Sequence, residues 1–135
     1  DPNGSKEGVV IDTIGPHIAA DVEGLTLYYA SETDGYLIAS SQGDDTYTIY
    51  SRGDINNFIG RFSVVDSETI DGTSSTDGID VCNMGLGGKL SDGIFIVQDD
   101  VNDVGNQNFK IISWGEIASI FNPPLEINSG YDLRN

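Results

Sequence analysis

Hydrophobic and polar positions alternate along most of the chain in short runs, which are separated by Gly, Asn, Asp and Ser. Alternation with a period of two predicts half-buried β-strands that are joined by turns. In the run at residues 25–30, for example, Leu25, Leu27 and Tyr29 alternate with the residues between them. Similar runs follow at 36–41, 46–51 and 58–65. Residues 25–65 therefore predict a four-stranded antiparallel meander.

The pattern begins again after a loop. Strand-like runs occupy residues 78–82, 93–98 and 108–113, and residues 114–121 can form a short helix that ends before Asn122-Pro123-Pro124. A further strand-like run lies at residues 8–14 and has no hairpin partner next to it. Two successive units of antiparallel strands, with one earlier strand, are therefore expected.

The two units resemble each other in sequence. Asp34-Gly35-Tyr36-Leu37-Ile38 is similar to Asp92-Gly93-Ile94-Phe95-Ile96, 58 residues later. Repeats of four strands are typical of the blades of a β-propeller. A β-sandwich also has strands about every 8 to 12 residues, but the recurring period favours blades. We predict an all-β chain of about two to two and a half blades with a short C-terminal helix.

The predicted blades assign the chain as follows. Residues 8–14 are a strand of a preceding blade, 18–66 one blade, 77–121 a second blade with the helix, and 122–135 a tail. A propeller needs about four to eight blades to close. The chain is therefore expected to be part of a larger protein.

The charge of the chain is strongly unbalanced. There are 22 acidic and 6 basic residues, which gives a formal net charge of −16. Nucleic acid is an unsuitable partner, because phosphate backbones are held by clustered Lys and Arg, and the basic residues here are scattered. No apolar run is long enough to span a membrane. The single cysteine, Cys82, excludes an intrachain disulfide and is expected to be a buried thiol. Bound divalent cations would offset the self-repulsion of so many carboxylates.

Residues 71–80 form an oxygen-rich segment between the two units. Asp71, Asp77 and Asp80 lie among hydroxyl side chains and glycines. Calcium takes about six to eight oxygen ligands, so this segment is a candidate calcium loop. A solvated acidic turn is the alternative. Asp21 and Glu23 form a second candidate, because residues two apart in a strand project to the same face. Two such carboxylates attract a cation, although a solvated strand edge gives the same pattern.

Several motifs together resemble one family. They are Ala20-Asp21-Val22-Glu23-Gly24-Leu25-Thr26, Gly35-Tyr36-Leu37, Ala39-Ser40-Ser41-Gln42-Gly43, Asp71-Gly72-Thr73-Ser74, Thr76-Asp77-Gly78-Ile79-Asp80-Val81, Gly93-Ile94-Phe95 and Asn106-Gln107-Asn108-Phe109-Lys110. In this order and spacing they are similar to the C-terminal part of the β-propeller phytases, the calcium-dependent alkaline phytases of bacteria. The resemblance runs from about Ile18 to about Ala118.

The resemblance implies a secreted, six-bladed propeller that hydrolyses phytate (inositol hexakisphosphate) by attack of a metal-activated water on phosphorus. It implies that Asp21 and Glu23 are calcium ligands at the active-site end. It also associates a second set with tightly held calcium: Asp71, Asp77, Asp99 and Asn102. Two departures, Ser75 in place of an aspartate and Asp100-Val101 in place of Gly-Glu, imply that coordination there differs in detail.

Our leading hypothesis is a fragment of a calcium-dependent phosphomonoesterase. It is expected to be inactive alone, because the basic residues that hold substrate phosphates in this family lie in earlier blades. The expected partners are phytate or other inositol phosphates as calcium complexes, and the remaining blades or a second copy at open sheet edges. The alternative is a non-catalytic calcium-binding β module for assembly or adhesion.

Overall fold

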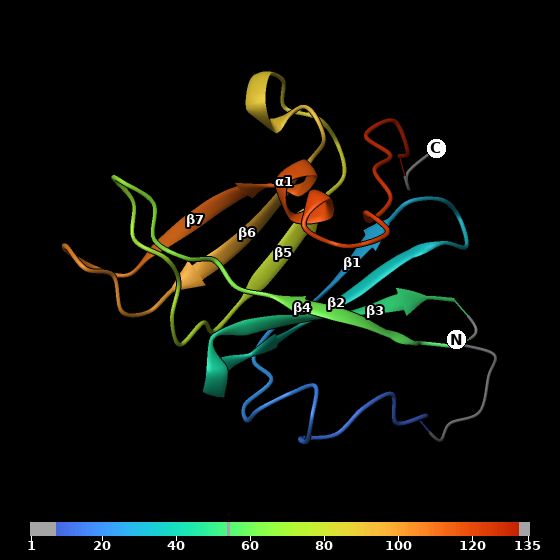
Figure 1. Ribbon diagram of the computed structural model, residues 1–135, viewed down its shortest axis with the longest axis horizontal. Coiled ribbons are helices and arrows are strands. Elements are labelled where there is room, and N and C mark those ends of the chain that lie inside the picture. Colours follow the sequence, from blue (N-terminus) through green and yellow to red (C-terminus); the bar gives the residue numbers. More distant parts are fainter. Residues whose placement is uncertain (1–7, 54, 133–135) are drawn as a thin grey trace.

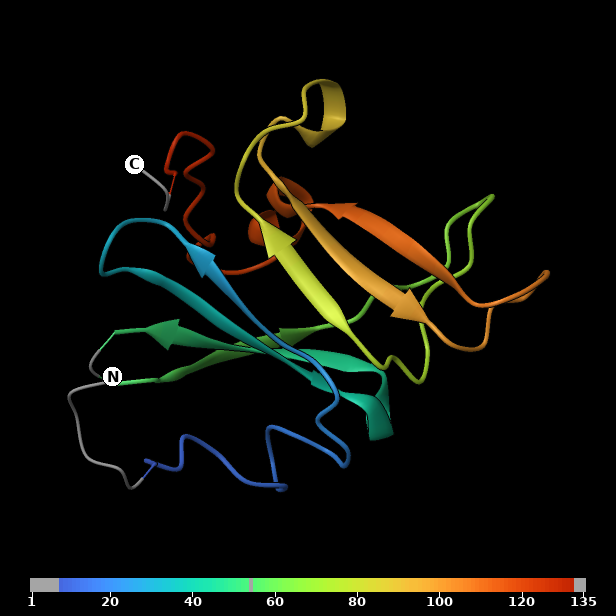
Figure 2. The ribbon, with the colours of Figure 1, turned by 180° about the vertical axis from the view of Figure 1, so that it is seen from behind.

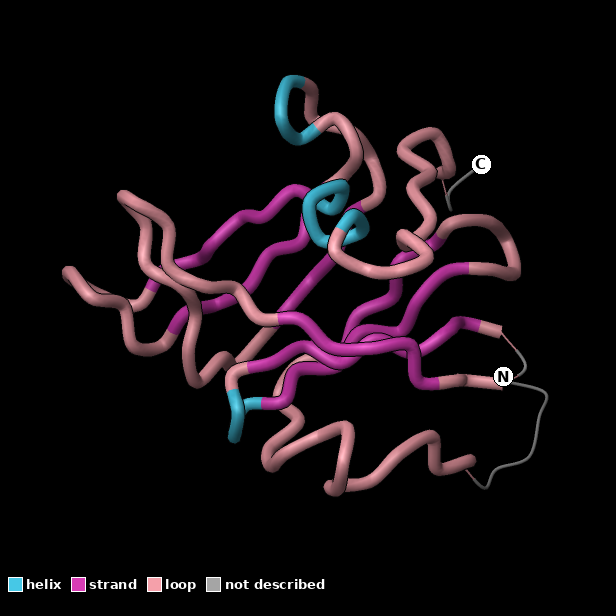
Figure 3. Tube along the Cα trace, viewed as in Figure 1, coloured by secondary structure: helices cyan, strands magenta, loops and turns pink. Residues whose placement is uncertain are grey.

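Figure 1 shows the computed structural model, in which residues 8–53 and 55–132 are described. The described residues form seven strands in two antiparallel sheets, and loops and one-turn 3₁₀ helices connect the strands (Figure 3). The first sheet has the order β1-β2-β3-β4: β1 (Leu25–Tyr29), β2 (Gly35–Ser41), β3 (Thr46–Arg52) and β4 (Phe58–Phe62). The second has the order β5-β6-β7: β5 (Ile79–Cys82), β6 (Ile94–Asp99) and β7 (Asn108–Ser113). The remaining elements are η1 (Gln42–Asp44), η2 (Gly88–Leu90) and the helix α1 (Trp114–Ser119). The predicted all-β class with one short helix is confirmed.

The first strands of the two sheets lie side by side. Figure 2 shows β1 and β5 next to each other and running in the same direction. The hydroxyl of Thr26 donates a hydrogen bond of 2.7 Å to Asp80 Oδ1. At Gly24 the approach is so close that a Cβ would lie 2.9 Å from the backbone nitrogen of Ile79. Two meanders that meet at their first strands have the arrangement of neighbouring propeller blades.

The core fills the space between the sheets. Its fully buried members include Tyr28, Ile38, Tyr47, Ile49, Phe95, Val97 and Trp114. The ring of Phe95 lies edge-on to Tyr47 and to Phe62, with centroid distances of 5.1 and 5.3 Å. These edge-to-face contacts join β3 and β4 of one sheet to β6 of the other.

The C-terminal segment ties the two sheets together at the end that carries α1. Trp114 stacks on Tyr28 at a centroid distance of 4.3 Å, and its Nε1 donates to the carbonyl of Glu126 at 3.1 Å. The hydroxyl of Tyr36 accepts from the Glu126 N–H at 2.7 Å, and that of Tyr28 accepts from the Asn128 N–H at 2.8 Å. Residues 133–135 of the expected tail lie outside the described residues.

Residues 8–14 differ from the expectation of a strand, because they have no regular secondary structure. Contacts made by side chains hold this segment, instead of backbone pairing with another strand. Asp12 Oδ2 accepts from the Tyr50 hydroxyl at 2.6 Å and lies 3.0 Å from His17 Nδ1. The Tyr50 hydrogen bond, the Thr13 N–H and His17 together lower the pKa of Asp12. The side chain of Ile18 anchors the next residues in a small cluster with Ala39 and Tyr50.

The expectation of a buried Cys82 is wrong. Strand β5 alternates between half-buried and exposed positions, and Cys82 shares the exposed face with Asp80. An apolar run alone does not reveal which face of a short strand is covered. Among the described residues, no helix is long and apolar enough to cross a membrane.

Candidate functional site

Two loops at one end of the second sheet run beside each other. Figures 1 and 2 show the loop before β5 and the loop between β6 and β7 in this arrangement. Asp71 Oδ2 accepts from the Asp103 N–H at 3.0 Å, and the Ser74 carbonyl accepts from the Asp100 N–H at 3.1 Å. Ser74 in turn donates its N–H to Asp99 Oδ1 at 3.0 Å. These bonds bring Asp71 and Asp99 together although they are 28 residues apart.

Three of the predicted metal ligands surround one ammonium group. Lys110 Nζ lies 2.7 Å from Asp71 Oδ1, 3.1 Å from Asp99 Oδ2 and 2.9 Å from Asn102 Oδ1. We call Asp71, Asp99 and Asn102 the oxygen cage. The bond from Lys110, together with the Asp103 N–H, lowers the pKa of Asp71. Burial alone would lower the pKa of Lys110, but its contacts with Asp71 and Asp99 outweigh burial, so the pKa is raised.

The donor set of the cage fits a hard cation. Asp99 is fully buried, and its Oδ2 accepts no aligned hydrogen bond within the described part of the chain. Asn108 lies opposite Asp99 in the β6–β7 pair, and its Oδ1 likewise accepts no hydrogen bond within the described residues. The Nδ2 group of Asn108 donates to Asn102 Oδ1 at 2.7 Å. Buried oxygens normally have partners, and carboxylate and carboxamide oxygens are the ligands that calcium prefers.

The cage contains only two carboxylates. Accordingly, no group of three or more His, Cys, Asp or Glu side chains that could hold a metal is found among residues 8–53 and 55–132. The third member of the cage, Asn102, supplies an amide oxygen. A cation bound here would meet only two negative charges, and the Lys110 ammonium already contacts both of these carboxylates.

Asp77 is linked to the segment that carries Asp21 through one residue, Gln42. Its Oδ1 accepts from Gln42 Nε2 at 3.2 Å, while the backbone N–H of Gln42 donates to the Asp21 carbonyl at 3.0 Å. Asp77 is also fixed by its own N–H, which donates to Gln98 Oε1 at 2.7 Å. The predicted set of four therefore has two different partners: Lys110 contacts three of its members, and Gln42 contacts Asp77.

The segment that carries Asp21 and Glu23 is fixed by its backbone, and both side chains are exposed. The buried Ser40 hydroxyl accepts the N–H groups of Glu23 at 3.0 Å and Gly24 at 2.8 Å. We call the exposed carboxylates of Asp21, Glu23 and Asp77 the acidic rim. The segment also passes very close to η1, since a Cβ at Gly43 would lie 2.1 Å from the Ala20 carbonyl oxygen.

Three residues that support these groups were not singled out from the sequence: Ser40, Gln42 and Lys110. Each lies within a motif quoted above, but spacing along the chain gave no sign of its partners. Lys110 had the clearest signal, because it takes the inward position of β7 between the exposed Phe109 and Ile111. A lysine at a buried position of a strand needs an acidic partner.

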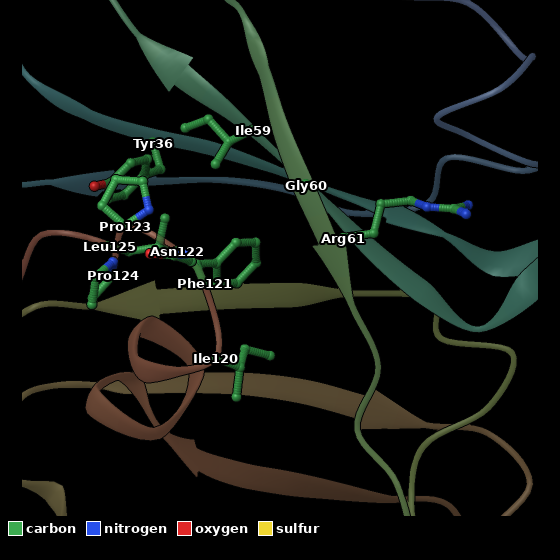
Figure 4. A pocket seen from close by; sticks show the side chains of 10 residues that line it. All are labelled: Tyr36, Ile59, Gly60, Arg61, Ile120, Phe121, Asn122, Pro123, Pro124 and Leu125. Atoms are coloured by element: carbon green, nitrogen blue, oxygen red, sulfur yellow. The ribbon is translucent and has the colours of Figure 1, made fainter.

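Two hollows border these elements. A groove of about 570 Å³ lies between β4 and the turn at 120–125, where Figure 4 shows Ile59, Phe121 and Pro123 facing it. Its cation, Arg61, points away from the groove and pairs with Asp44 Oδ2 at 2.8 Å. The groove is thus unsuited to a phosphate group. The second hollow, of about 1300 Å³, is lined by residues 62–71 and by β7, and it reaches Asp71, Asn102 and Lys110.

The two adjacent antiparallel sheets, of four and three strands, are consistent with neighbouring blades of a β-propeller, and their connections carry oxygen-rich segments. The sequence model of the phytase family matches residues 1–135, so the chain belongs to the phytase family. The chain is 52% identical over 123 residues to a 3-phytase of Bacillus subtilis (strain 168). That match covers 87% of this chain and 32% of the Bacillus protein, so the chain spans about a third of the length of this relative.

Proposed function

We propose that this chain is the C-terminal part of a secreted, calcium-dependent phosphomonoesterase that hydrolyses phytate. The observation that carries the proposal is the membership of the whole chain in the phytase family, together with its similarity to a 3-phytase. The acidic rim and the oxygen cage supply the type of oxygen ligands that this activity would need. The complete protein would be a propeller of six blades, as the resemblance implies.

The acidic rim is proposed to hold calcium at the active-site end. Asp21 and Glu23 are exposed, and their backbone is fixed by Ser40 and Gln42, so the two carboxylates are presented to solvent on an ordered support. Calcium held there would bind phosphate oxygens, neutralise charge and orient water for attack on phosphorus. Substrates would approach as calcium complexes of phytate or other inositol phosphates, because an acidic protein repels the free polyanion.

The oxygen cage is proposed to bind calcium for stability. Its members come from both loops that meet at the end of the second sheet, so a shared cation would fasten the segment between the blades to the β6–β7 connection. We assign Asp77 to the acidic rim and not to the oxygen cage, because Gln42 links it to Asp21.

Substitution of the rim tests the catalytic proposal. In the full-length protein, Asp21→Asn and Glu23→Gln should each lower the rate of phosphate release from phytate by about 100-fold, since metal stabilisation of developing charge supplies several kcal/mol. The exposed Glu32, in the β1–β2 hairpin, provides a matched control: Glu32→Gln should retain the rate. The 135-residue chain alone should release no phosphate. Unchanged rates in both rim variants would contradict the proposal and favour a non-catalytic calcium-binding module.

The outer edge of the second sheet is proposed to pair with another strand, either from the remaining blades or from a second copy. Strand β7 is the last strand of its sheet, and Phe109 and Ile111 on it are 70% and 55% exposed. Unpaired edge strands with apolar side chains favour association. The isolated chain should therefore self-associate in light scattering, and Phe109→Lys with Ile111→Lys should reduce this. Ile55→Lys, at an exposed position elsewhere, is the control. A monodisperse monomer of the unsubstituted chain would contradict the proposal.

A further inference from the structure

The ammonium of Lys110 contacts the same oxygen atoms that a cation in the cage would use. Its three contacts, at 2.7, 3.1 and 2.9 Å, go to Asp71 Oδ1, Asp99 Oδ2 and Asn102 Oδ1. The lysine side chain is only 8% exposed and that of Asp99 only 1%. Lys110 is therefore a built-in counter-ion of the cage.

A divalent cation and this ammonium compete for the cage. Calcium needs oxygen atoms at about 2.3–2.6 Å, which would place it within a few ångströms of Nζ if both contacted these three atoms. Like charges so close together repel strongly, most of all where water is excluded. The three oxygens can therefore coordinate either the ammonium or a metal ion, but not both at once.

The structure leaves space for the lysine to move. The hollow of about 1300 Å³ borders Lys110, and the acidic residues Asp66, Glu68 and Glu116 are also among the residues that line it. A lysine has a flexible four-carbon stem, so its ammonium can turn from the cage toward these acidic side chains.

We propose that Lys110 is an internal competitor for calcium: it neutralises the cage when calcium is scarce and turns away when calcium binds. The inference rests on the proposed calcium role of Asp71, Asp99 and Asn102. Lys110 thereby keeps the two loops joined without metal, and it weakens calcium binding, so that the cage fills only at higher calcium concentrations.

The test compares Lys110→Met, which keeps the stem and removes the charge, with Lys89→Met. Lys89 is exposed and lines the same hollow, but it is not a contact of the cage. In calorimetric titrations of the protein with calcium chloride, Lys110→Met should bind calcium at least about tenfold more tightly than the unsubstituted protein. Without calcium its Tm should be lower. Lys89→Met should change both quantities much less.

Equal or weaker calcium binding by Lys110→Met, while the unsubstituted protein binds, would overturn the inference and leave the proposed function intact. Absence of calcium binding in both proteins would instead contradict the calcium role of the cage. A second measurement needs no variant and so does not depend on folding of Lys110→Met. Acetylation of the unsubstituted protein, followed by mass spectrometry, should modify Lys110 several-fold faster with saturating calcium than with chelator, relative to Lys89. A rate that is unchanged or lower with calcium would overturn the proposal.

Discussion

Replacing Trp114 with alanine should lower the free energy of unfolding by about 3–5 kcal/mol, the usual cost of removing a large buried aromatic side chain. Trp114 is fully buried, stacks on Tyr28 at 4.3 Å and donates from Nε1 to the Glu126 carbonyl. The substitution therefore opens a cavity and leaves a carbonyl without its partner. It also loosens the C-terminal segment, whose Glu126 and Asn128 N–H groups are accepted by Tyr36 and Tyr28.

Urea denaturation followed by circular dichroism measures this loss. Because small domains are stable by only about 5–15 kcal/mol, the Trp114→Ala protein should lose a large part of its stability. Ile120→Ala, just after α1 at a 66% exposed position, is the matched control and should change the stability by less than about 1 kcal/mol. A loss for Trp114→Ala no larger than that of the control would show that Trp114 does not join the two sheets.

The strands could be predicted from the sequence because their determinants are local. Alternating side chains and turn residues located all seven strands to within a few residues of their observed ends, and Trp114 began the predicted helix. Because one face of each strand is buried, apolar side chains recur at every second position. Residues 8–14 show the limit: they have the composition of a strand, but no strand among the described residues pairs with them, and hydrogen bonds to Asp12 fix them instead.

The grouping of the site residues could not be predicted, because it depends on contacts between distant segments. Asp71 and Asp77 are close in sequence, yet Lys110 holds one and Gln42 contacts the other. Composition identified the oxygen-rich segment, whereas the path of its backbone decided which carboxylates meet. The same holds for Ser40, whose hydroxyl fixes the segment with Glu23 from a buried position on β2.

Calcium should raise the Tm of the protein by about 10 °C at a concentration 100 times its dissociation constant. A ligand that binds only the folded form contributes about 2.7 kcal/mol at that concentration, and for a chain of this size 1 kcal/mol corresponds to a few degrees. The physical reason lies in the formal charge of −16 and in the buried Asp99, whose Oδ2 lacks an aligned hydrogen bond within the described residues. Bound calcium would coordinate this oxygen directly in place of the Lys110 ammonium, which lies 3.1 Å away, and would add positive charge to a strongly acidic chain.

Differential scanning calorimetry with calcium chloride, followed by addition of a chelator, measures this shift. Magnesium chloride at equal ionic strength is the control for charge screening, because magnesium requires a stricter octahedral geometry at shorter distances and retains its waters. Asp99→Asn, which keeps the shape of the side chain, should remove most of the calcium-dependent shift, whereas Glu32→Gln should leave it unchanged. Equal Tm shifts with both metals would indicate that the ions only screen the surface carboxylates. No shift with calcium would contradict the structural role of the cage, because any ion that binds the folded protein selectively must raise its Tm.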